Sequence, residues 1–186
     1  MNQDEVVGRI VEALVQSGVP SMIAGSFASN LHGVPRMTQD ADIVIDADEA
    51  AALRLVHLLE GDFYVSEDAA LDAVRRRGMF NAIHFDSGFK VDLIVKKDRA
   101  FSAEELRRRE PGLLAGKRVD FATAEDTILT KLEWAKLGHS ERPYHDAVGI
   151  IRVQEPRLDW RYLEHWASDL GVANLLEQAR RAGPFD

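Results

Sequence analysis

Hydrophobic and polar residues follow two kinds of pattern along the first two-thirds of the chain, and only one kind along the last third. Residues 4–17 carry apolar side chains at helical spacing, including Val6, Ile10 and Leu14, and Gly18 follows where a helix C-cap belongs. Short apolar or alternating runs predict strands at 22–24, 40–46 and 63–65. Helical patterns lie between and after them, at 26–32, 48–60 and 67–77.

The middle of the chain predicts a hairpin. Residues 81–85 and 89–95 both have strand-like patterns, and they flank the segment 86–88, which ends in a glycine. Two such runs around a three-residue turn with glycine are typical of two antiparallel strands.

After residue 101 the pattern becomes mainly helical. Ser102 and Glu105 have the spacing of a capping box at the start of a short helix, and residues 117–121 predict one more strand. Four helices are then predicted, at 124–137, 143–153, 158–170 and 172–182. The predicted fold class is α+β: a mixed, mostly antiparallel sheet flanked by helices, followed by a C-terminal helical bundle. We expect an α/β core at 1–122 and a helical region at 123–186 that packs on it.

Composition narrows the class of protein. The 186 residues are 46% hydrophobic, which is enough for a core, and no apolar run approaches the roughly 20 residues of a membrane span. The absence of cysteine excludes disulfides, thiolate metal sites and a thiol nucleophile. The first five residues are polar and acidic, unlike a signal peptide, so we expect a cytoplasmic location. The net charge of −8 argues against a protein that coats nucleic acid non-specifically.

Three aspartates stand out from this background. Asp40 and Asp42 are two residues apart in a predicted strand, so their side chains point to the same side. Asp92 lies inside the apolar run 89–95, where a carboxylate is costly unless it is paired or binds a metal. If the two strands are neighbours, the three carboxylates converge, and oxygen ligands alone suit Mg²⁺ or Mn²⁺. In the alternative interpretation Asp40 caps the start of its strand and Asp42 pairs with Arg36.

Gly25 and Ser26 precede this pair of aspartates. A glycine lets a phosphate approach the backbone, and a helix N-terminus attracts anions. The alternative interpretation of Ser26 is an ordinary helix N-cap.

The combination of these segments resembles the DNA-polymerase-β-like nucleotidyltransferase superfamily. Residues 23–26 (IAGS), a spacer of thirteen residues and residues 40–43 (DADI) are similar to its hydrophobic-Gly-Gly/Ser turn and its Asp-hydrophobic-Asp/Glu pair. Residues 91–93 (VDL) are similar to its third acidic position. Serine in place of a second glycine and Ala41 between the aspartates are mild departures.

Other segments resemble a particular group within this superfamily, the bacterial abortive-infection (AbiEii-like) and minimal nucleotidyltransferases. In these an Arg-x-Thr commonly precedes the first aspartate, as Arg36 and Thr38 do here. Residues 124–132, with Lys131, are similar to the group's lysine-bearing helix, and residues 142–146, ending in Asp146, to its Arg-x-x-Asp motif. The similarity covers about residues 20–150.

The resemblance implies a polymerase-β-like sheet and a role for each of these residues. Asp40 and Asp42 would hold the metal ions, Mg²⁺ or Mn²⁺, and through them the triphosphate; Asp92 would hold the catalytic metal and help to deprotonate the incoming hydroxyl. Lys131 is expected to be the fourth catalytic residue. The nucleotide-binding residues would be Gly25, Ser26, Arg36, Thr38, Lys131 and Asp146. Three of these have alternative interpretations: Lys131 as a solvated lysine, Asp146 as a helix N-terminal aspartate, and Arg36 as the partner of a strand carboxylate.

The implied activity is transfer of a nucleoside monophosphate from an NTP to a hydroxyl or phosphate acceptor. The acceptor is left open between a tRNA end, a protein side chain and a small molecule of the aminoglycoside type. The enzyme could be the toxin of a toxin–antitoxin or abortive-infection system, with a cognate antitoxin as partner. The alternatives are a non-catalytic, antitoxin-like protein of the same fold, and a metal-free α/β protein whose aspartates are only salt-bridged.

Overall fold

The computed structural model describes residues 1–138 and 141–182, which form two compact units. The first unit comprises Met1–Ser26 and Thr38–Ala122, and the second comprises Phe27–Met37 and Thr123–Asp186. Residues 27–37 therefore group with the C-terminal helices, although the sequence placed them in the core. That the helical region packs on the core stays a prediction.

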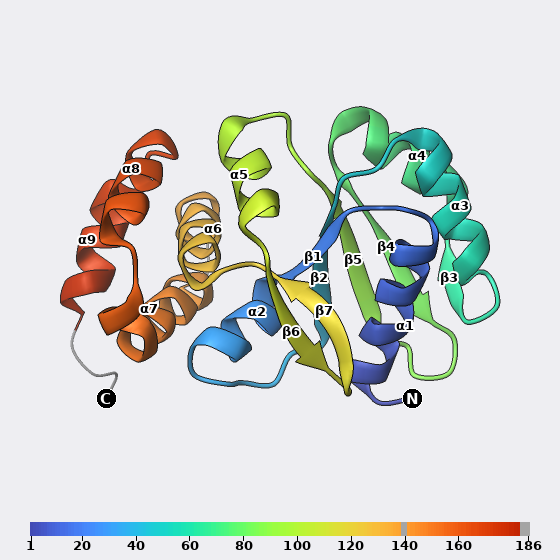
Figure 1. The fold of residues 1–186 in the computed structure, drawn as a ribbon, viewed down its shortest axis with the longest axis horizontal. Helices are drawn as coiled ribbons and strands as arrows, with labels where there is room; N and C mark the ends of the chain where they lie inside the picture. Colours follow the sequence, from blue (N-terminus) through green and yellow to red (C-terminus); the bar gives the residue numbers. More distant parts are fainter. Residues whose placement is uncertain (139–140, 183–186) are drawn as a thin grey trace. The chain divides into compact units, whose positions relative to one another are not determined.

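Seven strands in the described ranges form one sheet within the first unit (Figure 1). They are β1 Ser21–Ala24, β2 Asp40–Ile45, β3 Phe63–Val65, β4 Met79–His84, β5 Lys90–Val95, β6 Glu110–Leu114 and β7 Lys117–Phe121. Their spatial order is β3-β4-β5-β2-β1-β7-β6. The β2–β5 and β1–β7 pairs are parallel and the other neighbours are antiparallel. The mixed, mostly antiparallel sheet expected from the sequence is confirmed.

The helices of the first unit bury one apolar stripe each. They are α1 Gln3–Gln16, α3 Glu49–Leu59, α4 Glu67–Arg76 and α5 Ala100–Arg108. Helix α1 begins with a capping box between Asn2 and Glu5, and its residues Val6, Ile10 and Leu14 are fully buried. It contacts α3, β6 and β7, while α3 packs beside α4 and β3 (Figure 1). Helix α4 also contacts β4 and β5, the strand that carries Asp92.

The second unit is helical. It contains most of α2 Gly25–His32, together with α6 Ala124–Leu137, α7 Arg142–Gln154, the short 3₁₀ helix η1 Glu155–Arg157, α8 Trp160–Asp169 and α9 Ala173–Arg181. Thr123 caps α6 by accepting a hydrogen bond from the backbone N–H of Asp126. Helix α6 packs against α7 and α8, and α9 packs against α7 and α8 (Figure 1). The four helices predicted for this third of the chain are thus present.

One local expectation was wrong, and one strand was not predicted. Ser102 lies inside α5, whose N-cap is Arg99, and its hydroxyl accepts a hydrogen bond from Arg99 instead of capping the helix. Strand β6 was not expected, because Pro111 and Gly112 usually interrupt strands. Proline is tolerated in β6 because this strand lies at the edge of the sheet, where one row of backbone N–H groups needs no partner strand.

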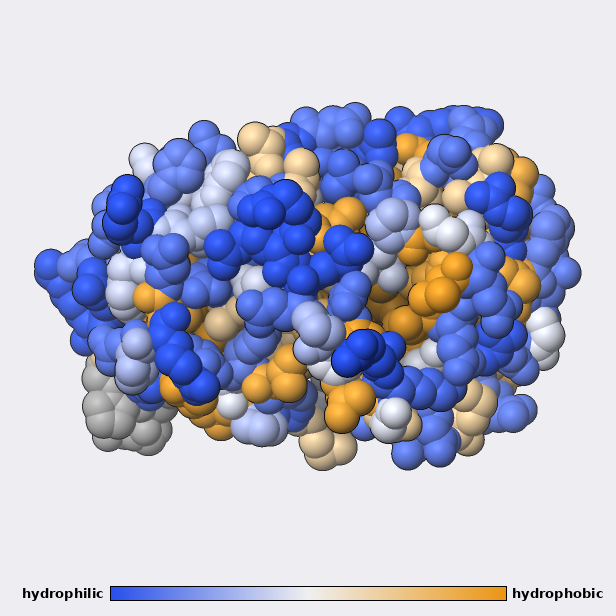
Figure 2. All heavy atoms as spheres, in the orientation of Figure 1, coloured by the Kyte–Doolittle hydropathy of each residue, from blue (hydrophilic) through white to orange (hydrophobic). Residues whose placement is uncertain are grey.

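The visible surface is largely hydrophilic. Figure 2 shows hydrophobic residues on this face only in smaller groups between hydrophilic ones. In the described ranges, no helix combines the length and the apolar character that crossing a membrane requires.

Candidate active site

The parallel pairing of β2 and β5 brings the three aspartates to one face of the sheet. Asp42 is in register with Asp92, and Asp40 is in register with Lys90. Residues in register on neighbouring strands have side chains on the same face, as do residues two apart on one strand. Asp40, Asp42 and Asp92 therefore share a face at adjacent positions.

Asp92 is the most buried of the three aspartates. The residue is only 5% exposed, and its Oδ2 accepts a hydrogen bond of 2.8 Å from the Lys90 ammonium. Its second oxygen, Oδ1, is buried and has no hydrogen-bond partner. A buried carboxylate oxygen without a partner is costly, so such an atom in a native site calls for a ligand or another role.

Lys90 is the cation of this face, and the sequence analysis did not identify it. Its Nζ lies 2.8 Å from Asp92 Oδ2 and 3.9 Å from Asp40 Oδ2. The hydrogen bond to Asp92 raises the pKa of Lys90 above its ordinary value; partial burial opposes this, and the charges of Asp92, Asp40 and Asp42 add to it. The ammonium therefore stays charged and offsets part of the negative charge of the three carboxylates.

Gly25 makes room for the Asp42 carboxylate. A Cβ at position 25 would overlap the Asp42 side chain, and the backbone φ of +56° is one that residues with a side chain rarely adopt. Ser26 follows in the first turn of α2 and is 8% exposed. Glycine is thus required for the close approach of the turn to the aspartate.

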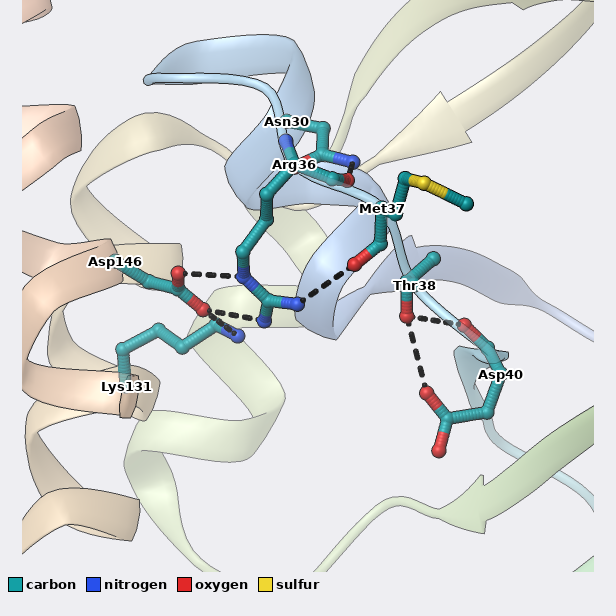
Figure 3. Close-up of polar contacts among 7 residues, drawn as sticks. All are labelled: Asn30, Arg36, Met37, Thr38, Asp40, Lys131 and Asp146. Carbon is teal, nitrogen blue, oxygen red and sulfur yellow. Dashed lines mark hydrogen bonds and ion pairs between the residues drawn. The ribbon is translucent and has the colours of Figure 1, made fainter. Parts of the chain in front are cut away.

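Thr38 holds Asp40. Its hydroxyl donates to the Asp40 carbonyl at 3.0 Å and lies 3.1 Å from the carboxylate Oδ1 (Figure 3). The threonine, named as a nucleotide-binding candidate, therefore contacts the start of β2 and fixes the first aspartate.

The donor set of this face fits a hard divalent cation. It offers carboxylate oxygens from three residues, one of them the buried, unpartnered Oδ1 of Asp92, and a glycine that leaves space beside Asp42. No three His, Asp or Glu side chains in the described ranges are yet arranged to hold a metal ion. Without metal, Lys90 and Thr38 each engage one of the carboxylates.

The other candidates form a second cluster, in the helical unit. Lys131 of α6 donates to Asp146 Oδ2 of α7 at 2.8 Å, and Arg36 grips both oxygens of Asp146 at 2.9 Å each (Figure 3). Burial alone would raise the pKa of Asp146, but the hydrogen bonds from Arg36 and Lys131 outweigh it and lower the pKa below its ordinary value. Arg36 thus pairs with a helix carboxylate, Asp146.

Comparison with known proteins places the architecture. No protein-family model matches the sequence, and no curated protein is similar to it. Among solved structures, an antigenic nucleotidyltransferase-like protein from Paracoccidioides brasiliensis is similar, with a TM-score of 0.60 and 17% identity over 96% of this chain and 92% of that one. ANT(2'')-Ia in complex with adenylyl-2''-tobramycin has a TM-score of 0.57 and 16% identity over 98% and 100% of the two chains. This chain has the nucleotidyltransferase fold.

A third structure with this fold extends the comparison. The lincomycin-bound lincosamide antibiotic adenylyltransferase LnuA has a TM-score of 0.55 and 11% identity, over 82% of this chain and 98% of that one. At such identities the likeness concerns the fold and not the chemistry. The nucleotidyltransferase fold and its mixed sheet are thereby confirmed, whereas the AbiEii-like subgroup and the roles of the individual residues stay predictions.

Two polar residues of this nucleotidyltransferase fold were missed from the sequence. One is Lys90, and the other is Asn81 of β4, which is exposed and in register with Asp92. Asp42, Asp92 and Asn81 therefore form a row across three strands. The alternating pattern of β4 predicts that Asn81 faces away from the packed side of the strand, but only the strand pairing shows that it lies beside an aspartate.

Proposed function

We propose that the chain is a metal-dependent nucleotidyltransferase that moves a nucleoside monophosphate from an NTP to an acceptor oxygen. The observation that supports this most is the pairing of Asp42 with Asp92, with one Asp92 oxygen buried and without a hydrogen-bond partner. Most buried polar atoms of a folded protein have a hydrogen-bond partner, so this oxygen is a candidate to bind a ligand. The shared fold with known nucleotidyltransferases adds to this support.

Asp40, Asp42 and Asp92 are the residues that would hold Mg²⁺ or Mn²⁺. Such ions, when bound, neutralise the charge of the triphosphate and polarise the transferring phosphate. The three side chains come from two adjacent strands whose backbones are fixed by a continuous ladder, so they are positioned before any ligand arrives.

The transfer itself needs a nucleophile, a proton acceptor and a leaving group. The acceptor oxygen attacks the α-phosphorus of the NTP, the bond from that phosphorus to the bridging oxygen breaks, and pyrophosphate leaves. In our proposal Asp92, which would also hold the catalytic metal, helps to deprotonate the attacking hydroxyl through its carboxylate.

Gly25 and Ser26 would receive the β- and γ-phosphates. Gly25 keeps the turn clear of a side chain beside Asp42, and the dipole at the N-terminus of α2 favours anions. Lys131 would contact the triphosphate. Asp146 would hold the lysine in place through its hydrogen bond, and Arg36 would in turn hold Asp146. Asp146 is then a positioning residue.

A small hydroxylated molecule is the acceptor that the comparisons favour. ANT(2'')-Ia is seen with adenylylated tobramycin and LnuA with lincomycin, so two proteins of this fold handle small antibiotics. A tRNA end or a protein side chain as acceptor, a toxin role and a cognate antitoxin stay predictions from the sequence resemblance.

The test is pyrophosphate release from each of the four NTPs with Mg²⁺ or Mn²⁺, in the presence of aminoglycosides, lincosamides or tRNA. We expect release with at least one pair, and a loss of about a hundredfold or more in Asp92→Asn, since a charged metal ligand contributes several kcal/mol to the transition state. Asp120→Asn is the matched control, because Asp120 lies in β7 of the same sheet and pairs with Arg109 at 2.9 Å. Equal activity in Asp92→Asn and wild type, or no release in any combination, would contradict the proposal and favour a non-catalytic protein of this fold.

A further inference from the structure

Lys90 contacts the face that would bind the metal, and its side chain is more exposed than that of its hydrogen-bond partner Asp92. Its side chain is 38% exposed, whereas that of Asp92 is 7% exposed. A lysine has a long flexible stem and an ammonium that is well solvated in water. When a ligand competes with this ion pair, the lysine is the partner that can swing away.

The ion pair satisfies only half of the buried carboxylate. Lys90 hydrogen-bonds Asp92 Oδ2, while Oδ1 keeps no hydrogen-bond partner, and the same ammonium lies 3.9 Å from Asp40. The single positive charge therefore faces three carboxylates and cannot neutralise them fully. A divalent cation on the same carboxylates would offset more of their charge, and it would repel an ammonium at this distance.

We propose that the Lys90 ammonium is the built-in counter-cation of the metal-free site, and that it leaves the carboxylates when the metal ion binds. The inference rests on the metal site of the proposed function. Lys90 stabilises the protein without metal by reducing repulsion among the aspartates, and it weakens metal binding because the ion must displace it. The affinity of the site for the metal ion is consequently lower than that of the three carboxylates without Lys90.

The first test compares Mn²⁺ affinity, measured by electron paramagnetic resonance without nucleotide, in wild type, Lys90→Met and Lys117→Met. Lys117 is a matched control, because it is 44% exposed, lies in the same sheet and pairs with a different carboxylate, Glu12, at 2.6 Å. We expect Lys90→Met to bind Mn²⁺ about threefold to tenfold more tightly, because a partly exposed competing charge is lost. Without metal, this variant should melt at a lower temperature than wild type. Lys117→Met should bind Mn²⁺ like wild type.

The second test uses the wild-type protein and does not depend on the folding of a variant. In ¹⁵N-labelled protein, the Lys90 ammonium should give an ordered, hydrogen-bonded NMR signal without metal, and this signal should shift and broaden as Mg²⁺ is added. The Lys117 signal should not change. A Lys90 signal that stays the same at saturating Mg²⁺, with saturation followed on the backbone amides of β2 and β5, would overturn the inference.

The outcomes separate this inference from the proposed function. Mn²⁺ binding that is equal in wild type and Lys90→Met, or weaker in the variant, would overturn the role of Lys90 and leave the metal site intact. No Mn²⁺ binding in wild type or either variant would overturn the metal site and the inference with it. Tighter Mn²⁺ binding in Lys90→Met than in wild type, with no change in Lys117→Met, supports both the metal site and the role of Lys90.

Discussion

Asp42 and Asp92 lie directly opposite each other on neighbouring strands, and Lys90 is the cation that offsets their charge. Like charges directly opposite each other on neighbouring strands are destabilising. Asp42→Asn should therefore leave the melting temperature of the metal-free protein unchanged or slightly higher, while nucleotidyl transfer is lost. The measurements are thermal unfolding without metal and NTP consumption with it.

A salt-bridged Asp42 would have the opposite signature. If the charge of Asp42 served only to pair with a cation, the amide would remove a favourable interaction and the melting temperature would fall. A clearly destabilised Asp42→Asn would therefore favour a structural aspartate over a metal ligand.

Gly25 allows a second prediction for a single residue. Gly25→Ala should destabilise the protein by more than the roughly 1–2 kcal/mol that a positive φ costs a residue with a side chain, because the new Cβ also displaces the Asp42 carboxylate. It should also weaken Mn²⁺ binding. Gly18→Ala is the control: its φ is +72° but no atom lies within 4 Å of the added Cβ, so only the backbone cost applies. Equal effects of the two variants on stability and on Mn²⁺ binding would show that the space beside Asp42 is unimportant.

At the scale of secondary-structure elements, Asp146 joins helix α7 to helix α6 and to the loop after α2, through Lys131 and Arg36. Its pKa is lowered in the folded protein from an ordinary value of 3.8, so its ionised form stabilises the fold at neutral pH. This contribution is complete above pH 3.8 and is lost as the pH falls below that value toward the lower folded pKa. We expect Asp146→Asn to cost about 1.5–3 kcal/mol at pH 7, as hydrogen bonds to charged groups do.

The same variant should lose less stability than wild type when the pH is lowered from 5 to 2.5. Urea unfolding at several pH values measures both effects. Asp72→Asn is the control, because Asp72 is exposed and pairs with Arg76. Asp126 is unsuitable because it accepts hydrogen bonds from Thr123 and Tyr162, which the substitution would also disturb. A parallel pH dependence in Asp146→Asn and wild type would contradict the assignment of the pKa shift to Asp146.

The elements that the sequence predicts well are those with strong local signals. Helix α1 and the β4–β5 hairpin follow from apolar spacing and turn residues within a few positions of one another. Strand β6 could not be predicted, because its proline is acceptable only at the edge of a sheet, and the order of strands is not a local property. The start of α5 was misplaced because a serine with a glutamate three residues later also occurs inside helices.

In the candidate site, too, the features with a local sequence signal were predicted and the long-range contacts were not. The spacing of Asp40 and Asp42 alone predicts a shared face, and the strand pairing with Asp92 agrees with it. Lys90 and Asp92 share a face because they are two residues apart in β5. The contact of Lys90 with Asp40 depends on the register of β2 against β5, and the pairing of Arg36 with Asp146 joins residues 110 positions apart. Neither the Lys90–Asp40 contact nor the Arg36–Asp146 pair has a local signal. Lys90 was therefore not predicted as part of the site, and Arg36 was predicted as a nucleotide-binding residue or the partner of a strand carboxylate, not as the partner of Asp146.

At the scale of the whole molecule, the net charge of −8 and the aspartates of β2 and β5 oppose the binding of an NTP by itself. A metal ion removes this repulsion, so nucleotide and metal should bind together. A ligand that binds only the folded protein stabilises it by about 2.7 kcal/mol at a hundred times its Kd. For a chain of this size that corresponds to a rise in melting temperature of about 5–10 °C.

We therefore expect Mg²⁺ with an NTP to raise the melting temperature, and NTP with a chelator to leave it unchanged. Ser26→Ala and Lys131→Ala should reduce the rise. Lys136→Ala is the control for Lys131, because Lys136 lies in the same helix and its Nζ is 3.4 Å from the carbonyl of Leu170. A rise that Lys131→Ala and Lys136→Ala reduce equally would argue that Lys131 has only the structural role shown by its ion pair with Asp146. No rise with any of the four NTPs, with either Mg²⁺ or Mn²⁺ at millimolar concentration, would argue against a nucleotide site. A ligand that binds the folded protein at these concentrations must stabilise it.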